Sequence, residues 1–166
     1  MKAKRPTVFF SLTFGILLIV SGIFTAVFII FAEPIVGLLG ASGDLLPLGR
    51  DYLLGLAVGF PAILLVTTLA PFAQLEGNQK IAITAVSGMV VVNIAGDLLN
   101  AIVFKGGLLG MGIATSVGSY VALIIALIHF LTNKKGYHLT IRHLNWRTAH
   151  RIILPGLPTA GGRLFA

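Results

Sequence analysis

The chain has 166 residues, of which 57% are hydrophobic and 10% are charged, and its mean hydropathy is +1.00. Soluble domains carry about 25% charged residues, so this composition excludes a soluble domain and indicates an integral membrane protein. The net charge of +7 does not indicate nucleic-acid binding, because the basic residues lie between long apolar runs, and the absence of cysteine excludes disulfides and thiolate chemistry.

Four apolar segments are long enough to cross a bilayer as helices, which takes about 20 residues. In chain order they are residues 8–32, 52–73, 81–104 and 108–131. The first follows a basic N-terminus but is too long for a signal peptide, so we predict an uncleaved helix. A fifth apolar segment, residues 152–166, stops too early to span, and the chain therefore looks cut off. The predicted fold class is an all-α polytopic membrane protein.

Proline and small residues predict the shape and packing of two of these spans. In the second span, Pro61 and Pro71 each remove a backbone donor, which predicts a kink at each position. In the fourth span, Gly110, Ala114 and Gly118 recur every four residues, a pattern that lets two membrane helices approach closely. We interpret that pattern as ordinary helix packing.

The basic residues predict the orientation, because excess Lys and Arg stay on the cytoplasmic side of a membrane. If the four spans alternate in direction, one side carries only Arg50 and Lys105. The other side carries nine basic residues: Lys2, Lys4, Arg5, Lys80, Lys134, Lys135, Arg142, Arg147 and Arg151. We therefore expect both termini to be cytoplasmic, with residues 133–151 as a basic cytoplasmic segment.

Asp97 is an acidic residue in the middle of the third span, where a carboxylate costs on the order of 2.5 to 3.5 kcal/mol. Asn93 lies four residues before it and Asn100 three after it, so all three share one helical face as a polar stripe. Thr115 of the fourth span is expected to lie level with Asp97, across the short turn at residues 105–107. The oxygens of Asn93, Asp97 and Thr115 suit a hard cation such as Na⁺, and a desolvated carboxyl can instead bind a proton. We predict that these three residues form a cation-coupling site.

In the alternative interpretation, Asp97 only hydrogen-bonds Asn93, Asn100 or Thr115 and so joins two helices. We favour an ion site, because acids inside membranes often mark ion or substrate pathways.

Apart from this site no metal is predicted, and no cofactor is expected beyond the coupling ion. An enzyme is not expected, because the sequence shows no nucleophile-base pair, phosphate-binding loop or paired carboxylates. Glu33 and Glu76 lie at span ends, where contact with solvent is the expected role.

Five short motifs resemble, in their order and spacing, the multidrug and toxic compound extrusion (MATE) family of cation-coupled antiporters. The motifs are Leu38-Leu39-Gly40-Ala41-Ser42, Gly59-Phe60-Pro61, Gln74-Leu75-Glu76-Gly77-Asn78, Asn93-Ile94-Ala95-Gly96-Asp97 and Gly107-Leu108-Leu109-Gly110-Met111-Gly112-Ile113-Ala114-Thr115. The resemblance implies a fold of twelve helices in two lobes, in which the four spans here are helices three to six. It also implies that Asn93, Asp97 and Thr115 match cation-site positions of the family.

The resemblance further implies how the chain is divided. Residues 1–132 would be a partial first lobe, residues 133–151 the linker between the lobes, and residues 152–166 the start of the second lobe. The missing remainder of the transporter would then be its main partner, together with the lipid bilayer.

The implied function is multidrug efflux across the cell membrane, in which amphipathic or cationic drugs or metabolites leave in exchange for Na⁺ or H⁺. Two alternatives stay open. One is a lipid-linked oligosaccharide flippase of the same superfamily, which a cavity rich in Arg and Lys would favour. The other is a noncatalytic membrane scaffold, in which Asp97 only joins helices.

Overall fold

A computed structural model describes residues 4–132 of the chain, with side chains from residue 10 onward. This part forms six α-helices and one short π-helix, with no strand among the described residues. Their bounds are α1 Lys4–Ile30, α2 Ala32–Leu38, α3 Leu45–Ala57, α4 Phe60–Leu75, α5 Gln79–Leu99, η1 Asn100–Phe104 and α6 Gly107–Thr132. The predicted linker at 133–151 and the predicted fifth segment at 152–166 lie outside the described residues.

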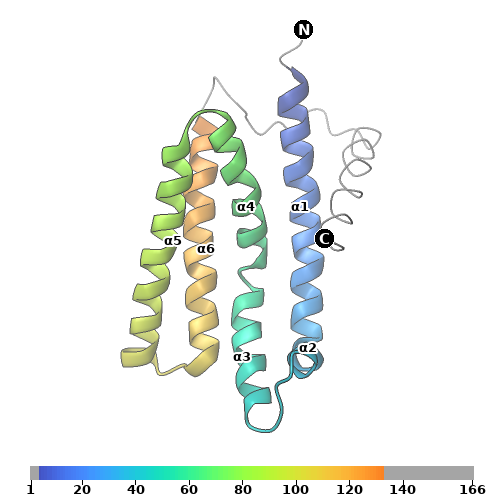
Figure 1. Cartoon of the computed structure of the whole chain (residues 1–166), viewed down its shortest axis with the longest axis vertical. Helices are drawn as coiled ribbons and strands as arrows, with labels where there is room; N and C mark the ends of the chain where they lie inside the picture. The colour runs from blue at the N-terminus through green and yellow to red at the C-terminus, as the bar shows by residue number, and fades with distance from the viewer. Residues whose placement is uncertain (1–3, 133–166) are drawn as a thin grey trace.

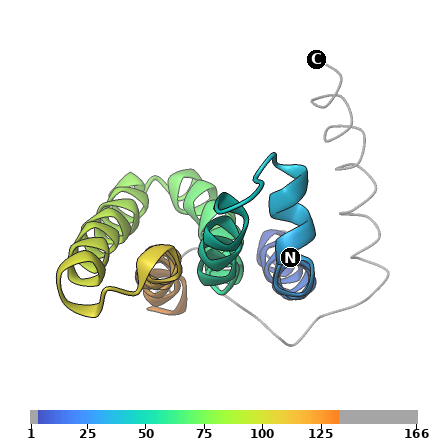
Figure 2. The same cartoon turned by 90° about the horizontal axis from the view of Figure 1, so that it is seen from below.

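The long helices stand side by side in one bundle (Figure 1). Viewed from below, α6 lies between α5 on one side and the α3–α4 pair on the other, with α1 beyond α3 (Figure 2). The N-terminal end of α1 and the α4–α5 turn lie at one end of the bundle, which we call the α4–α5 end. The short helix α2 and the α5–α6 turn lie at the opposite end, which we call the α2 end.

Three helices are long and apolar enough to cross a membrane, and the pair α3–α4 makes a fourth span if the two are counted together. The first, third and fourth predicted spans correspond to α1, to α5 with η1, and to α6. The second predicted span, residues 52–73, is corrected by the structure. It begins earlier, at Leu45, and is two helices that meet at a bend of 53°.

The bend lies at Val58 and Gly59, and Pro61 is the second residue of the helix that follows. Proline is well tolerated in the first turn of a helix, where its missing N–H would have no partner. The structure shows no helix break at Pro71: α4 continues through this proline to Leu75. A single lost backbone bond in the last turns of α4 therefore does not end that helix.

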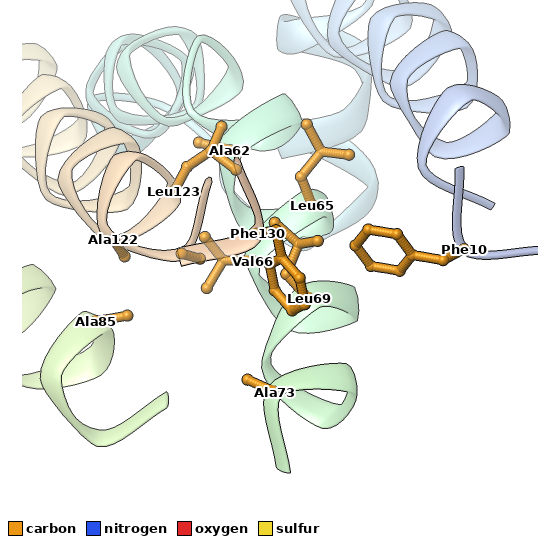
Figure 3. Packing of buried hydrophobic residues seen from close by; sticks show 11 residues of the cluster. Phe10, Ala62, Leu65, Val66, Leu69, Ala73, Ala85, Ala122, Leu123 and Phe130 are labelled. Atoms are coloured by element: carbon orange, nitrogen blue, oxygen red, sulfur yellow. The ribbon is translucent and has the colours of Figure 1, made fainter. Parts of the chain in front are cut away.

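The largest buried cluster ties α1, α4, α5 and α6 together near the α4–α5 end. Figure 3 shows Phe10 of α1 directed toward Phe130 of α6 and Leu69 of α4. The ring centroids of Phe10 and Phe130 lie 4.9 Å apart, and both side chains are almost fully buried. Burial of each large apolar side chain contributes about 1.5–3 kcal/mol in water. In a membrane, close packing of this kind is the main force between helices.

Small residues give α6 two opposite packing faces. Toward α5, a Cβ on Gly118 would lie 2.8 Å from the Met89 carbonyl oxygen, and Ala114 faces Gly96. Toward α3, a Cβ on Gly112 would lie 2.5 Å from the Tyr52 carbonyl oxygen. The prediction that the small residues of the fourth span serve close helix packing is therefore confirmed.

Candidate functional site

The predicted polar residues of the third and fourth spans meet in part where α5 packs on α6. The side-chain amide nitrogen of Asn93 donates to the hydroxyl oxygen of Thr115 at 2.9 Å. The Thr115 hydroxyl in turn donates to the Met111 carbonyl oxygen at 3.2 Å, within its own helix. Close contact between small residues brings the two helices near enough for this bond, because Gly118 lies one turn along α6 against the backbone of Asn93.

Asp97 lies one turn beyond Asn93 on α5, so both side chains project from the same face of the helix. One of its carboxylate oxygens, Oδ1, is buried and has no hydrogen-bond partner in the described part of the chain. Buried polar atoms are paired in the great majority of cases, and an unpaired one needs an explanation. An ion or a proton that binds at this oxygen would supply one.

Asn100 has a different role from the one its spacing suggested. Its Nδ2 donates to the Gly107 carbonyl oxygen at 2.9 Å, and its Oδ1 accepts from the Gly106 amide at 3.0 Å. Both groups of the side chain are therefore used by the α5–α6 turn. The backbone carbonyl of Asn100 also accepts from the Lys105 amide at 2.7 Å, in the five-residue spacing of η1. Asn100 thus closes the turn and is not directed at Asp97.

A shallow apolar groove of about 530 Å³ lies along α5, η1 and α6. Asn93, Asp97 and Thr115 do not line it, whereas Gly96 and Ala114 do. Successive residues of a helix point about 100° apart, so Asp97 projects on one side of the contact between Gly96 and Ala114. The groove lies on the other side, and the two features are separate.

A close contact between Glu76 and His129 at the α4–α5 end was not predicted from the sequence. His129 Nε2 lies 3.0 Å from Glu76 Oε2, and their side chains are only 11% and 9% exposed. The sequence predicted that Glu76 would contact solvent, but the structure places it against α6. The two residues are 53 positions apart, so no local pattern could have revealed the pair.

Comparison with known proteins decides the family. The sequence matches the MatE family over residues 2–99, which is more than half of the chain. The chain belongs to the MatE family. The matched residues include Asn93 and Asp97, whereas Thr115 lies beyond them. As a MatE member with long apolar helices, the protein is a multi-pass membrane protein.

Curated relatives of this MatE chain carry the name Multidrug export protein MepA. The protein from Staphylococcus saprophyticus subsp. saprophyticus is 31% identical over 123 residues, which are 74% of this chain and 27% of that protein. The protein from Staphylococcus aureus strain bovine RF122 is 27% identical over 103 residues, which are 62% of this chain and 23% of that protein. The chain thus spans about a quarter of the length of these relatives. No solved structure matches it.

Proposed function

We propose that this chain is part of a cation-coupled efflux transporter and that Asp97 is a coupling group. The observation that carries the proposal is the buried Oδ1 of Asp97, which has no partner among the described residues. It lies one turn from Asn93, whose amide already donates to Thr115. An Na⁺ ion held by oxygens of Asn93, Asp97 and Thr115, or a proton on Asp97, would compensate for the burial.

The hydrogen bonds around Asp97 weigh against the alternative in which it only joins helices. The amide of Asn93 and the hydroxyl of Thr115 bond each other and the α6 backbone, and the side chain of Asn100 bonds the turn. None of these bonds involves Asp97. A scaffold role would require the Asp97 carboxylate to hydrogen-bond a group on another helix. Its buried Oδ1 forms no such bond within the described part of the chain.

The exported compounds would be drugs, as the name Multidrug export protein MepA of the relatives suggests. That these drugs are amphipathic or cationic is part of the proposal and follows from the resemblance to cation-coupled antiporters. Inward movement of Na⁺ or H⁺ would drive a change between two states of the transporter, and this requires the ion to bind the two states with different affinity. The nine basic residues on one side support an orientation in which both ends of this segment are cytoplasmic. The proposed location is the plasma membrane. No enzymatic step is proposed.

The test is cation-driven efflux of a fluorescent cationic drug from everted vesicles that contain the whole protein. The expected result is that Asp97→Asn abolishes efflux driven by an imposed gradient while membrane insertion is retained. Separate experiments with an Na⁺ gradient and with a pH gradient show which ion drives the efflux. Asp44→Asn is the matched control, because Asp44 is exposed just before α3 and its change removes the same charge. Unchanged gradient-driven efflux in Asp97→Asn would refute the proposal.

A further inference from the structure

The backbone break between α3 and α4 removes the normal helical partners of four consecutive carbonyl groups, from Gly55 to Val58. Pro61 has no N–H, so the Ala57 carbonyl cannot accept the bond that a continuous helix would give it. The Gly59 amide donates to the Leu56 carbonyl at 2.9 Å, three residues back instead of four. Figure 1 shows the break as the short irregular segment between α3 and α4.

Ser116 of α6 binds the first half of this break. Its hydroxyl lies 2.7 Å from the Gly55 carbonyl oxygen and 3.3 Å from that of Leu56. Ser116 is almost fully buried, and a Cβ on Gly59 would lie 2.5 Å from its hydroxyl oxygen. The glycine therefore lets the start of α4 rest directly on α6.

Two further hydroxyl groups bind the second half of the break. Thr25 Oγ1 of α1 donates to the Ala57 carbonyl oxygen at 3.3 Å. The Tyr120 hydroxyl of α6 donates to the Val58 carbonyl oxygen at 3.0 Å. All four carbonyl oxygens of the break thus lie within hydrogen-bond distance of a hydroxyl group of another helix, and the single hydroxyl hydrogen of Ser116 is shared between Gly55 and Leu56. Inside a bilayer an irregular backbone must find such partners within the protein.

Donors on neighbouring helices make the bend depend on where those helices lie. A helix that satisfies its own backbone keeps its shape when a neighbour moves, whereas these bonds change length if α1 or α6 shifts relative to α3. Ser116 also follows Thr115 directly in α6, although the two side chains face different neighbours. Thr115 accepts from α5 while Ser116 donates to α3, so α6 connects the predicted cation site to the break.

We propose that the Val58–Gly59 break is a hinge of the transport cycle and that Ser116, Thr25 and Tyr120 are its positioning residues. Their hydrogen bonds hold the 53° bend in the state described here. A shift of α6 when a cation binds would shorten or break these bonds. Hinges absorb backbone rotation at a few residues between packed elements, as Val58 and Gly59 would do. The coupling to the cation rests on the proposed function, whereas the dependence of the bend on the three hydroxyls does not.

The experiment measures the distance between spin labels on either side of the break in the full protein in nanodiscs. These 166 residues contain no cysteine, so within this part of the protein labels attach only where they are introduced. Leu48→Cys in α3 and Leu75→Cys at the end of α4 are exposed positions across the break. Ile83→Cys and Ile94→Cys, both exposed on α5, form the control pair within one helix.

Without any gradient, Tyr120→Phe combined with Thr25→Val is expected to broaden the distance distribution across the break or to add a second distance. These changes remove two hydroxyls with little change of shape, so folding is retained. Ser116→Ala is the third variant and should have the same effect. Thr67→Val is the matched control, because this α4 hydroxyl bonds the Leu64 carbonyl of its own helix, and the distribution should not change. Identical distributions in all these variants and the wild type would overturn the hinge.

The link to ion binding is tested by adding Na⁺, or by lowering the pH, with the same labels in place. The wild type is expected to show a shift across the break that Asp97→Asn abolishes, while the control pair on α5 does not change. If cation-driven efflux is intact and the distance across the break never responds, the hinge is wrong although the proposed function stands. If the hydroxyl variants broaden the distance but Asp97→Asn transports normally, the proposed function is wrong and the hinge stands without the cation link.

Discussion

Asn93 of α5 and Thr115 of α6 are joined side chain to side chain by a 2.9 Å hydrogen bond across 22 residues of sequence. The bond uses the amide nitrogen of Asn93, so its amide oxygen takes no part in it. That oxygen, the Thr115 hydroxyl oxygen and the unpaired Oδ1 of Asp97 would be the three oxygen ligands of the proposed cation site, on facing helices. The pair therefore fixes the spacing of α5 and α6 at the level where the predicted cation would bind.

Thr115→Val is expected to weaken cation binding and to destabilise the protein. The substitution keeps the side-chain shape but leaves the Asn93 amide without its acceptor, and hydrogen bonds between membrane helices are worth about 0.6 kcal/mol each. Thermal unfolding in detergent measures the loss of stability as a lower melting temperature. The change in melting temperature on adding Na⁺, or between two pH values, measures cation binding. Thr115→Ser retains the hydroxyl and should keep the cation response. A cation-induced rise in melting temperature in Thr115→Val equal to the wild-type rise would exclude Thr115 as a ligand.

Gly112→Ala is expected to force α3 and α6 apart. Its new Cβ would lie 2.5 Å from the Tyr52 carbonyl oxygen and 2.8 Å from the Leu56 amide nitrogen, and both are backbone atoms that cannot rotate away. Overpacking of this kind costs about 1–3 kcal/mol. Gly22→Ala is the control, because nothing lies within 4 Å of a Cβ at that position in α1. Denaturant unfolding of both variants should show a loss only for Gly112→Ala, and equal stabilities would mean that the α3–α6 contact is looser than described.

The sequence predicts the long helices because a continuous apolar run leaves the backbone no other way to satisfy its polar groups in a bilayer. The short turn between the third and fourth spans also predicts that Asp97 and Thr115 lie level, whereas the structure bonds Thr115 to Asn93, one helical turn before Asp97. Pro61 predicts a kink in the second span. The hydroxyl groups of α1 and α6 that bond the carbonyls of the break, however, come from distant parts of the sequence, and no local pattern contains them.

The position of Asn100 shows where helical spacing misleads. Three residues after Asp97 it falls on the same face of an ideal helix, but the helix widens into η1 at this residue and its side chain is drawn into the turn. The pair of Glu76 and His129 was missed for a related reason. A polar residue at a span end is expected to contact water, and only the packing of α4 on α6 brings these two together.

Asn100→Ala is expected to destabilise the α5–α6 turn. The change removes one side-chain donor and one side-chain acceptor that bind Gly107 and Gly106, and a buried polar group left unpaired costs about 1–3 kcal/mol. Hydrogen exchange of the backbone amides in the turn should rise, and the melting temperature should fall. Asn78→Ala is the matched control in the α4–α5 turn, because the Asn78 side chain forms no capping hydrogen bond. Equal effects of the two changes would show that the side-chain bonds of Asn100 do not hold the turn.

The hydrogen-bonded pair of Glu76 and His129 is expected to stabilise the packing of α4 on α6. Glu76 stands at the C-terminal end of α4, where the helix dipole disfavours a negative charge by about 0.3–1 kcal/mol. His129 lies in the last turn of α6 and its ring nitrogen is 3.0 Å from the carboxylate, so the pair offsets that penalty. A double-mutant cycle of Glu76→Gln and His129→Gln should give a coupling energy of about 1 kcal/mol in thermal unfolding.

The cycle separates this pair from every other contact that either residue makes, since those contacts cancel between the single and double variants. Because both side chains are largely buried, the coupling should fall only slightly when the salt concentration rises, unlike that of an exposed pair. Glu33→Gln is the control, because Glu33 is exposed at the start of α2 and its change should leave stability within about 0.5 kcal/mol of the wild type. Additive effects of the two single changes would mean that the close approach of Glu76 and His129 contributes nothing to the contact between α4 and α6.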